Sequence, residues 1–130
     1  MAKTYCIVFV ISLFVMGDAF RLNQPDSING FIYRKAGETR VIVHYRLALA
    51  ARDARIRIIT AEQRRCVENL LGPFFKEGNE FINWTTNYMM YALKHSKNTS
   101  QSDQKKAIDS AFGKIVDQWL PGNVAELNKC

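Results

Sequence analysis

The sequence has few of the residues from which catalytic and metal sites are built. Only two of its 130 residues are histidines, His44 and His95, and neither has a second ligand at the spacing of an HExxH motif. It contains no glycine-rich phosphate loop, GxSxG elbow or CxxC pair. A pairing of Cys66 with a histidine is the remaining catalytic alternative, but a secreted context favours a disulfide. We therefore predict a protein that is not an enzyme and that uses no metal or cofactor.

Long hydrophobic runs are also scarce. The one such run, Cys6–Met16, is too short to cross a bilayer comfortably, follows Lys3 and precedes the small residues Gly17 and Ala19. This pattern predicts a cleaved signal peptide at residues 1–19 and a secreted single domain of about 111 residues at 20–130. The alternatives are an uncleaved anchor or a buried helix. No later run is long enough for a transmembrane helix.

Cysteine is too rare for a disulfide-framework protein. Cys6 lies in the predicted signal peptide, which leaves Cys66 and Cys130 in an oxidising compartment. We favour one internal disulfide between them, because Cys66 falls on an apolar helical face. The alternative is an intermolecular bond through Cys130.

Proline is limited to three residues, and the stretches between the prolines are typical of helices. We predict an all-α fold, a small bundle of about four to five helices. The interval 31–59 leaves two interpretations open. Arg40–Leu49 alternates as a strand would, which allows a hairpin, whereas Leu47–Arg55 is rich in strong helix formers. We favour helix, because a lone hairpin would find few partners among helices.

The stretch Thr60–His95 holds much of the aromatic content. Thr60 followed by Gln63 is a helix-start signal, and Gly72-Pro73 predicts a kink or a break in the middle. We expect both halves to pack against a later helix that holds Phe112 and Trp119. Pro121-Gly122 is expected to stop that helix, and Asn123 with Glu126 to start a last short turn.

Acidic residues are outnumbered, and the net charge is +6. All nine arginines lie between Arg21 and Arg65. On one continuous helix, Arg46, Arg57 and Arg64 would share a side, since they are eleven and seven residues apart. A basic secreted protein favours acidic glycans or glycoproteins, anionic membrane or an anionic protein as partner, and its compartment argues against nucleic acid. Solvated charge and simple core packing are the plainer interpretations of these arginines and of the aromatic residues.

One family shares several of these features. Thr60 with Gln63-Arg64-Arg65, followed by Trp84 and then Asn87-Tyr88-Met89, resembles the central helix of gastropod (abalone-type) sperm lysins, which carry a Thr-x-Gln-basic-basic opening and a Trp-x-Asn-Tyr-Met segment. Both half-motifs are one residue longer here. The resemblance therefore indicates a diverged relative, such as the acrosomal fusogenic paralogue of lysin.

The resemblance implies a protein of the sperm acrosome that acts in fertilization without catalysis. Its partner would be egg vitelline envelope glycoprotein or anionic membrane, and a homodimer is a further alternative. Arg64 and Arg65 would be basic contacts, to which helical spacing adds Arg46 and Arg57. The candidates for an apolar contact surface are Trp84, Tyr88 and Met89. The rival hypothesis is a small secreted helical carrier or signalling or effector protein that binds a lipid or a receptor.

Overall fold

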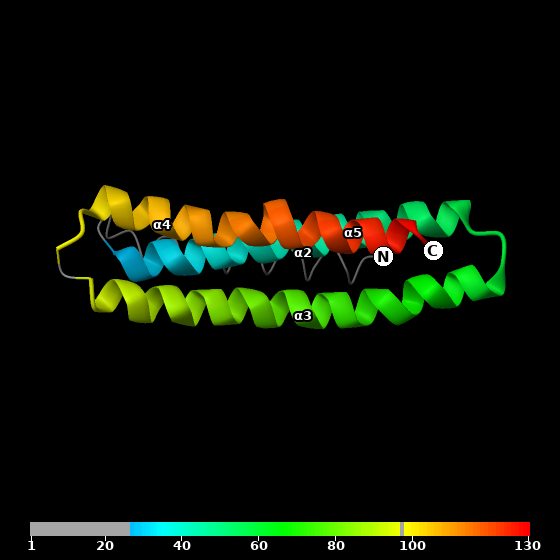
Figure 1. The fold of residues 1–130 in the computed structure, drawn as a ribbon, viewed down its shortest axis with the longest axis horizontal. Helices are drawn as coiled ribbons and strands as arrows, with labels where there is room; N and C mark the ends of the chain where they lie inside the picture. Colours follow the sequence, from blue (N-terminus) through cyan, green and yellow to red (C-terminus); the bar gives the residue numbers. More distant parts are fainter. Residues whose placement is uncertain (1–26, 97) are drawn as a thin grey trace, which may run out of the picture.

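The computed structural model describes residues 27–96 and 98–130, and its regular elements there are all helical (Figure 1). They form α2 (Ile28–Arg57), α3 (Ala61–Lys94), α4 (Gln101–Lys114), the π-helical turn η1 (Ile115–Trp119) and α5 (Leu120–Asn128). The last three are continuous, and we call them the C-terminal rod. The all-α prediction is confirmed, but these residues build three long rods where four to five helices were expected. The predicted signal peptide, residues 1–19, lies outside the described residues.

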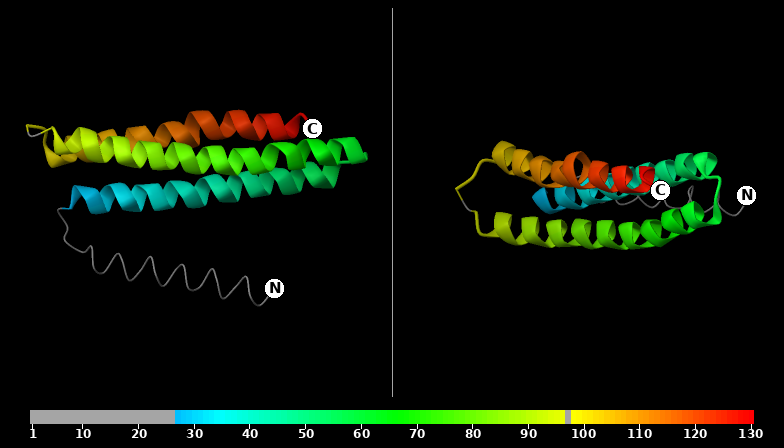
Figure 2. Two further views of the ribbon diagram at one scale, coloured as in Figure 1. Left: turned by 90° about the horizontal axis from the view of Figure 1, so that it is seen from below. Right: turned by 45° about the vertical axis from the view of Figure 1, so that its right-hand side comes forward.

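The three rods lie side by side along most of their length (Figures 1 and 2). The helix α3 runs antiparallel to α2 and to the C-terminal rod, and α2 contacts both. Among the described residues, no helix is both long enough and apolar enough to cross a membrane.

The interval 31–59 is helical over most of its length, as favoured. The hydroxyl of Ser27 begins α2 by accepting a hydrogen bond from the Gly30 N–H at 3.1 Å. The alternation of Arg40–Leu49 did not produce a strand. In the helix, the apolar residues of this segment lie on more than one side, so some are buried and others are exposed. Val43 and Leu47 are buried, whereas Val41, Ile42 and Tyr45 are exposed.

A capping box begins α3, as the sequence indicated. The Thr60 hydroxyl accepts from the Gln63 N–H at 3.2 Å, and the Gln63 side chain accepts from the Thr60 N–H at 3.0 Å. A kink or a break was predicted at Gly72-Pro73, and the break is wrong, since α3 continues through Pro73. Pro73 is exposed, and so is Asn69, whose carbonyl loses its usual partner. Water can take that hydrogen bond, and the rest of the helix is held by its packed face.

The predicted helix stop at Pro121 is also wrong. The Leu120 N–H donates to the Ile115 carbonyl five residues back, which makes the turn before Pro121 a π-helical turn. Pro121 then occupies the first turn of α5, where its missing N–H costs little. Asn123 does not cap a new helix, because its amide donates back to the Trp119 carbonyl at 3.1 Å.

One apolar core runs between the rods. Its largest fully buried side chains come from all three rods: Ile32, Leu47, Ile82, Ile108, Ile115, Leu120 and Leu127. The packing of α3 against the rod that holds Phe112 and Trp119 occurs as expected. Gly78 of α3 lies against the Trp119 ring, and Phe81 meets the same ring edge to face, with ring centroids 6.4 Å apart.

Candidate interaction surfaces

The two histidines make contacts within and beside the bundle. His44 is half-buried, with its Nε2 atom 3.1 Å from the Asn79 side-chain oxygen and its ring edge on Phe75. His95 is exposed beside the Tyr91 ring, at a centroid distance of 4.5 Å. In the part of the chain that the structure describes, no three His, Cys, Asp or Glu residues gather as a metal site would require. The functional candidates are therefore sought on the surface.

The two cysteines among the described residues are joined to each other. Cys66 lies near the start of α3, and Cys130 follows the end of α5, with a Cα–Cα distance of 5.7 Å. The structure thus contains the internal disulfide that the sequence favoured. It ties the last residue of this sequence to α3 and thereby fastens the C-terminal rod against its neighbour.

The four arginines predicted as basic contacts are divided between two helices. Arg46 and Arg57 are exposed on α2, eleven residues and about 16 Å apart along the helix. However, α2 ends at Arg57 and the chain reverses before Thr60, so Arg64 and Arg65 belong to the first turns of α3. The seven-residue spacing from Arg57 to Arg64 therefore does not place these two residues on one helical side, and that part of the prediction is wrong.

The chain reversal has a local cause. Ile58 is extended, with φ −75° and ψ 130°, and Thr60 starts a new helix by capping it. The reversal brings Arg57, Arg64 and Arg65 to the same end of the bundle, near the connection between α2 and α3.

These arginines differ in what their side chains contact. Arg57 donates to the Asp53 carbonyl at 3.3 Å and to the Asn128 side-chain oxygen at 3.1 Å. Within residues 27–96 and 98–130, the side chains of Arg46, Arg64 and Arg65 have no ion-pair or hydrogen-bond partner. Their guanidinium groups are the ones available to an external anion.

Two of the three apolar candidates form an exposed surface. Trp84 and Tyr88 are 62% and 53% exposed, and their rings stack in parallel with centroids 5.2 Å apart. Tyr91 continues the same stripe one turn further and is also exposed. Trp84, Tyr88 and Tyr91 are called the aromatic stripe below.

The third candidate, Met89, is wrong as a surface residue. It is 5% exposed and belongs to the core. Met89 lies four residues after Thr85 and seven after Ile82, both of which face the interior, so helical spacing places it on the buried side. Tyr88, one residue earlier, is turned about 100° away from Met89.

Sequence analysis missed a second exposed apolar surface on α2. Val41, Ile42, Tyr45 and Ile56 are all at least 40% exposed, although the opposite side of α2 is buried against both other rods. The sequence carried no clear signal for it, because apolar and charged residues are mixed all around this helix and no one side stands out as the core side.

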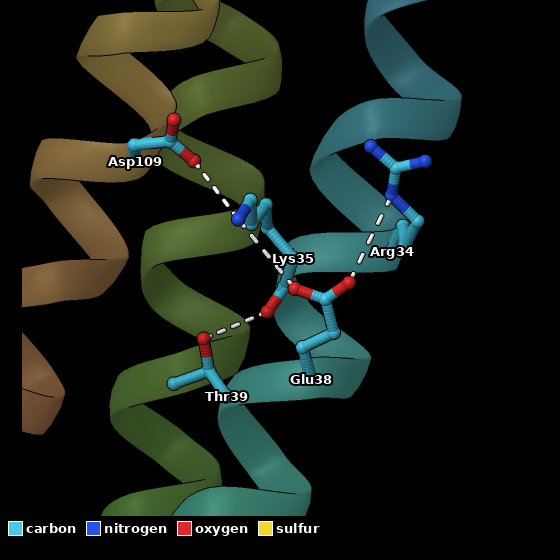
Figure 3. Close-up of polar contacts among 5 residues, drawn as sticks. All are labelled: Arg34, Lys35, Glu38, Thr39 and Asp109. Atoms are coloured by element: carbon cyan, nitrogen blue, oxygen red, sulfur yellow. Dashed lines mark hydrogen bonds and ion pairs between the residues drawn. The ribbon is translucent and has the colours of Figure 1, made fainter.

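A polar cluster joins α2 to α4 (Figure 3). The Lys35 ammonium lies 3.1 Å from an Asp109 carboxylate oxygen and 3.5 Å from a Glu38 oxygen. Its hydrogen bond to Asp109 is the main cause that raises the pKa of Lys35, against the desolvation that lowers it. The cluster links α2 to α4 at one point of their contact.

Together these features define a class: an all-α bundle of three rods with one disulfide, exposed arginines and two exposed apolar surfaces. Comparison with known proteins adds no narrower identification. No family model, no curated protein and no solved structure matches this chain.

Proposed function

We propose that this chain is a secreted, non-enzymatic protein of the sperm acrosome that acts in fertilization by binding egg vitelline envelope glycoprotein or egg membrane. The observation that carries the proposal is the aromatic stripe, which leaves large rings in solvent on a strongly basic protein. Isolated exposed apolar residues are normal, whereas stacked aromatic rings at helical spacing are typical of contact surfaces.

Free arginines complement that stripe. Arg64 and Arg65 lie near the start of α3, and the aromatic stripe lies near its end, so one helix carries both kinds of contact. Basic groups attract and orient an acidic glycoprotein or anionic membrane, and buried aromatic area then supplies most of the binding energy. The resemblance of Thr60–Met89 to sperm lysins supports the egg envelope or membrane as the target.

The carrier alternative requires the aromatic residues to line a cavity. Trp84, Tyr88 and Tyr91 are instead exposed. A shallow pocket lies at the end of the bundle, between the start of α2 and the end of α3, but Asn29, Lys94 and Gln104 contribute to its lining. A signalling or effector role would use the same exposed surfaces on a receptor.

The test uses isolated egg envelopes and anionic liposomes. We expect the purified protein to dissolve the envelopes or to mix the liposomes, with the envelope glycoproteins intact on a denaturing gel. Loss of both activities, or cleaved products, would contradict the proposal.

Two pairs of variants locate the contact. Trp84→Ala/Tyr88→Ala should lower the affinity for the target about tenfold or more, since central aromatic contacts dominate binding energies. Tyr33→Ala, at an exposed aromatic residue on α2, is its control.

Arg64→Gln/Arg65→Gln should slow association with the target. The control, Lys106→Gln/Lys114→Gln, removes the same amount of positive charge from α4. Equal effects of test and control variants would show that these residues do not form the contact.

A further inference from the structure

The outer side of α2 carries a stripe whose members are exposed, apart from one half-buried leucine. The stripe advances by four and three residues in turn, so its members share one side of the helix. We call it the α2 seam, and it consists of Glu38, Ile42, Tyr45, Leu49, Arg52 and Ile56.

The middle of the α2 seam is apolar. Tyr45 is 66% exposed and Ile56 is 75% exposed, and Val41 flanks them on the same side. Leu49 is half-buried, so part of its side chain also faces solvent, and the neighbouring Ala48 is exposed and small. The exposed apolar area therefore has protruding side chains beside a groove at the small Ala48, and helices pack by placing ridges of one into grooves of the other.

Several apolar residues of this surface match one another around Tyr45, whereas Ile56, eleven residues from Tyr45, would lie opposite Arg34. In an antiparallel second copy of α2 centred on Tyr45, residues equally distant from it on opposite sides come together. Leu49 of one chain would then lie opposite Val41 of the other, and the small Ala48 opposite the larger Ile42. Large side chains opposite a small one let two helices approach closely.

The charges of the α2 seam are arranged symmetrically as well. Glu38 and Arg52 each lie seven residues from Tyr45, on opposite sides of it. Both are exposed, with side chains 52% and 69% accessible, although each also has ion pairs within its own chain: Glu38 with Arg34 and Lys35, and Arg52 with Asp53. Exposed pairs of this kind contribute little and can exchange partners. The same antiparallel pairing would therefore bring Glu38 of each chain beside Arg52 of the other. A surface that matches itself after a two-fold rotation is what a symmetric dimer requires.

We propose that this protein forms a two-fold symmetric homodimer through the α2 seam, with the two α2 helices antiparallel and Tyr45 close to the axis. The two Glu38–Arg52 pairs set the direction of pairing, and the apolar residues between them provide the buried area. Repulsion between two chains of net charge +6 opposes association, but it is screened over about 10 Å at 0.1 M salt. Self-association through α2 does not depend on the egg partner.

An anionic membrane is the competing occupant, because α2 is rich in arginine. The two occupants respond oppositely to one charge change. Glu38→Arg adds positive charge, so it would strengthen binding to a membrane, but in the dimer it would place Arg beside Arg52 of the other copy. We favour the dimer because the seam contains a carboxylate and an arginine at symmetric positions, which a membrane surface would not need.

A charge-swap experiment tests the dimer by sedimentation velocity of the purified protein over a range of concentrations. We expect the wild type to be in a monomer–dimer equilibrium. Glu38→Arg and Arg52→Glu should each raise the dimer dissociation constant at least tenfold, since each places like charges together. The double variant Glu38→Arg/Arg52→Glu restores opposite charges and should return the constant to near the wild-type value.

Matched controls separate the contact from net charge. Glu80→Arg and Lys114→Glu make equivalent charge changes at exposed positions on other helices, and should leave the equilibrium unchanged. Tyr45→Cys should form a disulfide-linked dimer under mild oxidation, whereas Ser110→Cys on the exposed side of α4 should not. Circular dichroism would confirm that each variant is folded.

Three results would overturn the α2 dimer. They are a wild type that stays monomeric at high concentration, single variants that still dimerise, or a double variant that does not recover. A monomeric wild type whose Glu38→Arg variant binds anionic vesicles more tightly would assign the seam to a membrane instead.

Discussion

At the scale of single residues, Gly78 lies in close contact with two neighbouring rods. A Cβ atom at Gly78 would lie 3.0 Å from Cη2 of Trp119 and 3.1 Å from Cγ1 of Val43, on two different rods. Gly78→Ala should lower the free energy of unfolding by about 1–2 kcal/mol, because the Trp119 ring cannot yield as a flexible side chain would.

Gly37 is the matched control for that substitution. It also lies inside a helix, but a Cβ atom there would meet nothing within 4 Å. Gly37→Ala should therefore stabilise the protein by about 0.5–1 kcal/mol through helix propensity. Urea denaturation measures both, and a stabilising Gly78→Ala would show that the contact between α3 and Trp119 is looser than described.

Lys35 provides a pH-dependent contribution at the same scale. Its pKa is raised above the ordinary value of 10.5, chiefly by the hydrogen bond to Asp109. A raised pKa means that the folded state binds the proton more tightly, so the stabilisation is complete below the unfolded pKa and is lost as pH rises through the folded value. Because both side chains are partly exposed, we expect about 0.5 kcal/mol.

Asp109→Asn tests this contribution. The variant should be less stable than the wild type at about pH 8–9, and the difference should shrink as the pH rises beyond 10.5 and Lys35 loses its proton. Thermal unfolding of both proteins across this range is the measurement. A difference that stays constant over the alkaline range would contradict the assignment to Lys35.

At the scale of elements, the disulfide fastens the C-terminal rod to α3. Cys66 and Cys130 are separated by 64 residues, so their bond closes a loop that is large in the unfolded chain. The chain-entropy model gives a loop of this size about 4 kcal/mol of stabilisation. Reduction, or Cys66→Ala/Cys130→Ala, should therefore lower the melting temperature by roughly 10 °C or more.

The control for that prediction is to add reductant to the variant that lacks both cysteines. The double alanine variant should show no further loss when reductant is added, and the mass of the intact protein should rise by two hydrogens on reduction. A wild type whose melting temperature is insensitive to reductant would mean that core packing alone holds the rod in place.

At the scale of the whole molecule, the three rods share one core and are expected to unfold together. Buried residues from α2, α3 and the C-terminal rod belong to a single cluster, and no linker separates them into domains within the described ranges. A small domain of this kind unfolds in one cooperative transition.

Two tryptophans allow that expectation to be checked. Trp119, on the C-terminal rod, packs against α3, whereas Trp84 is exposed, so fluorescence from Trp84→Phe reports mainly on the contact between these two rods. Its denaturation midpoint should match that of helix content measured by circular dichroism. Separate midpoints would show that one rod detaches before the others.

Much of the fold follows from local sequence. The Thr60–Gln63 capping box starts α3 through two hydrogen bonds between neighbours in the chain. For 31–59, strong helix formers allowed a helix, and it was favoured because a lone hairpin would find few partners among helices. Pro73 and Pro121 gave the wrong boundaries, because each was judged by its missing N–H alone. Tertiary packing and, at Pro121, the η1 turn outweigh that local cost.

For the candidate surfaces too, some features follow from the sequence and others only from tertiary packing. The sequence alone determined a basic protein with three cysteines and with much of its aromatic content in Thr60–His95. Only the tertiary structure decided that Trp84 and Tyr88 are exposed while Met89 is buried, since the direction of the core depends on where the other rods pack. The same holds for the α2 seam, because a helix with apolar and charged residues mixed all around it does not reveal which side its own chain will cover.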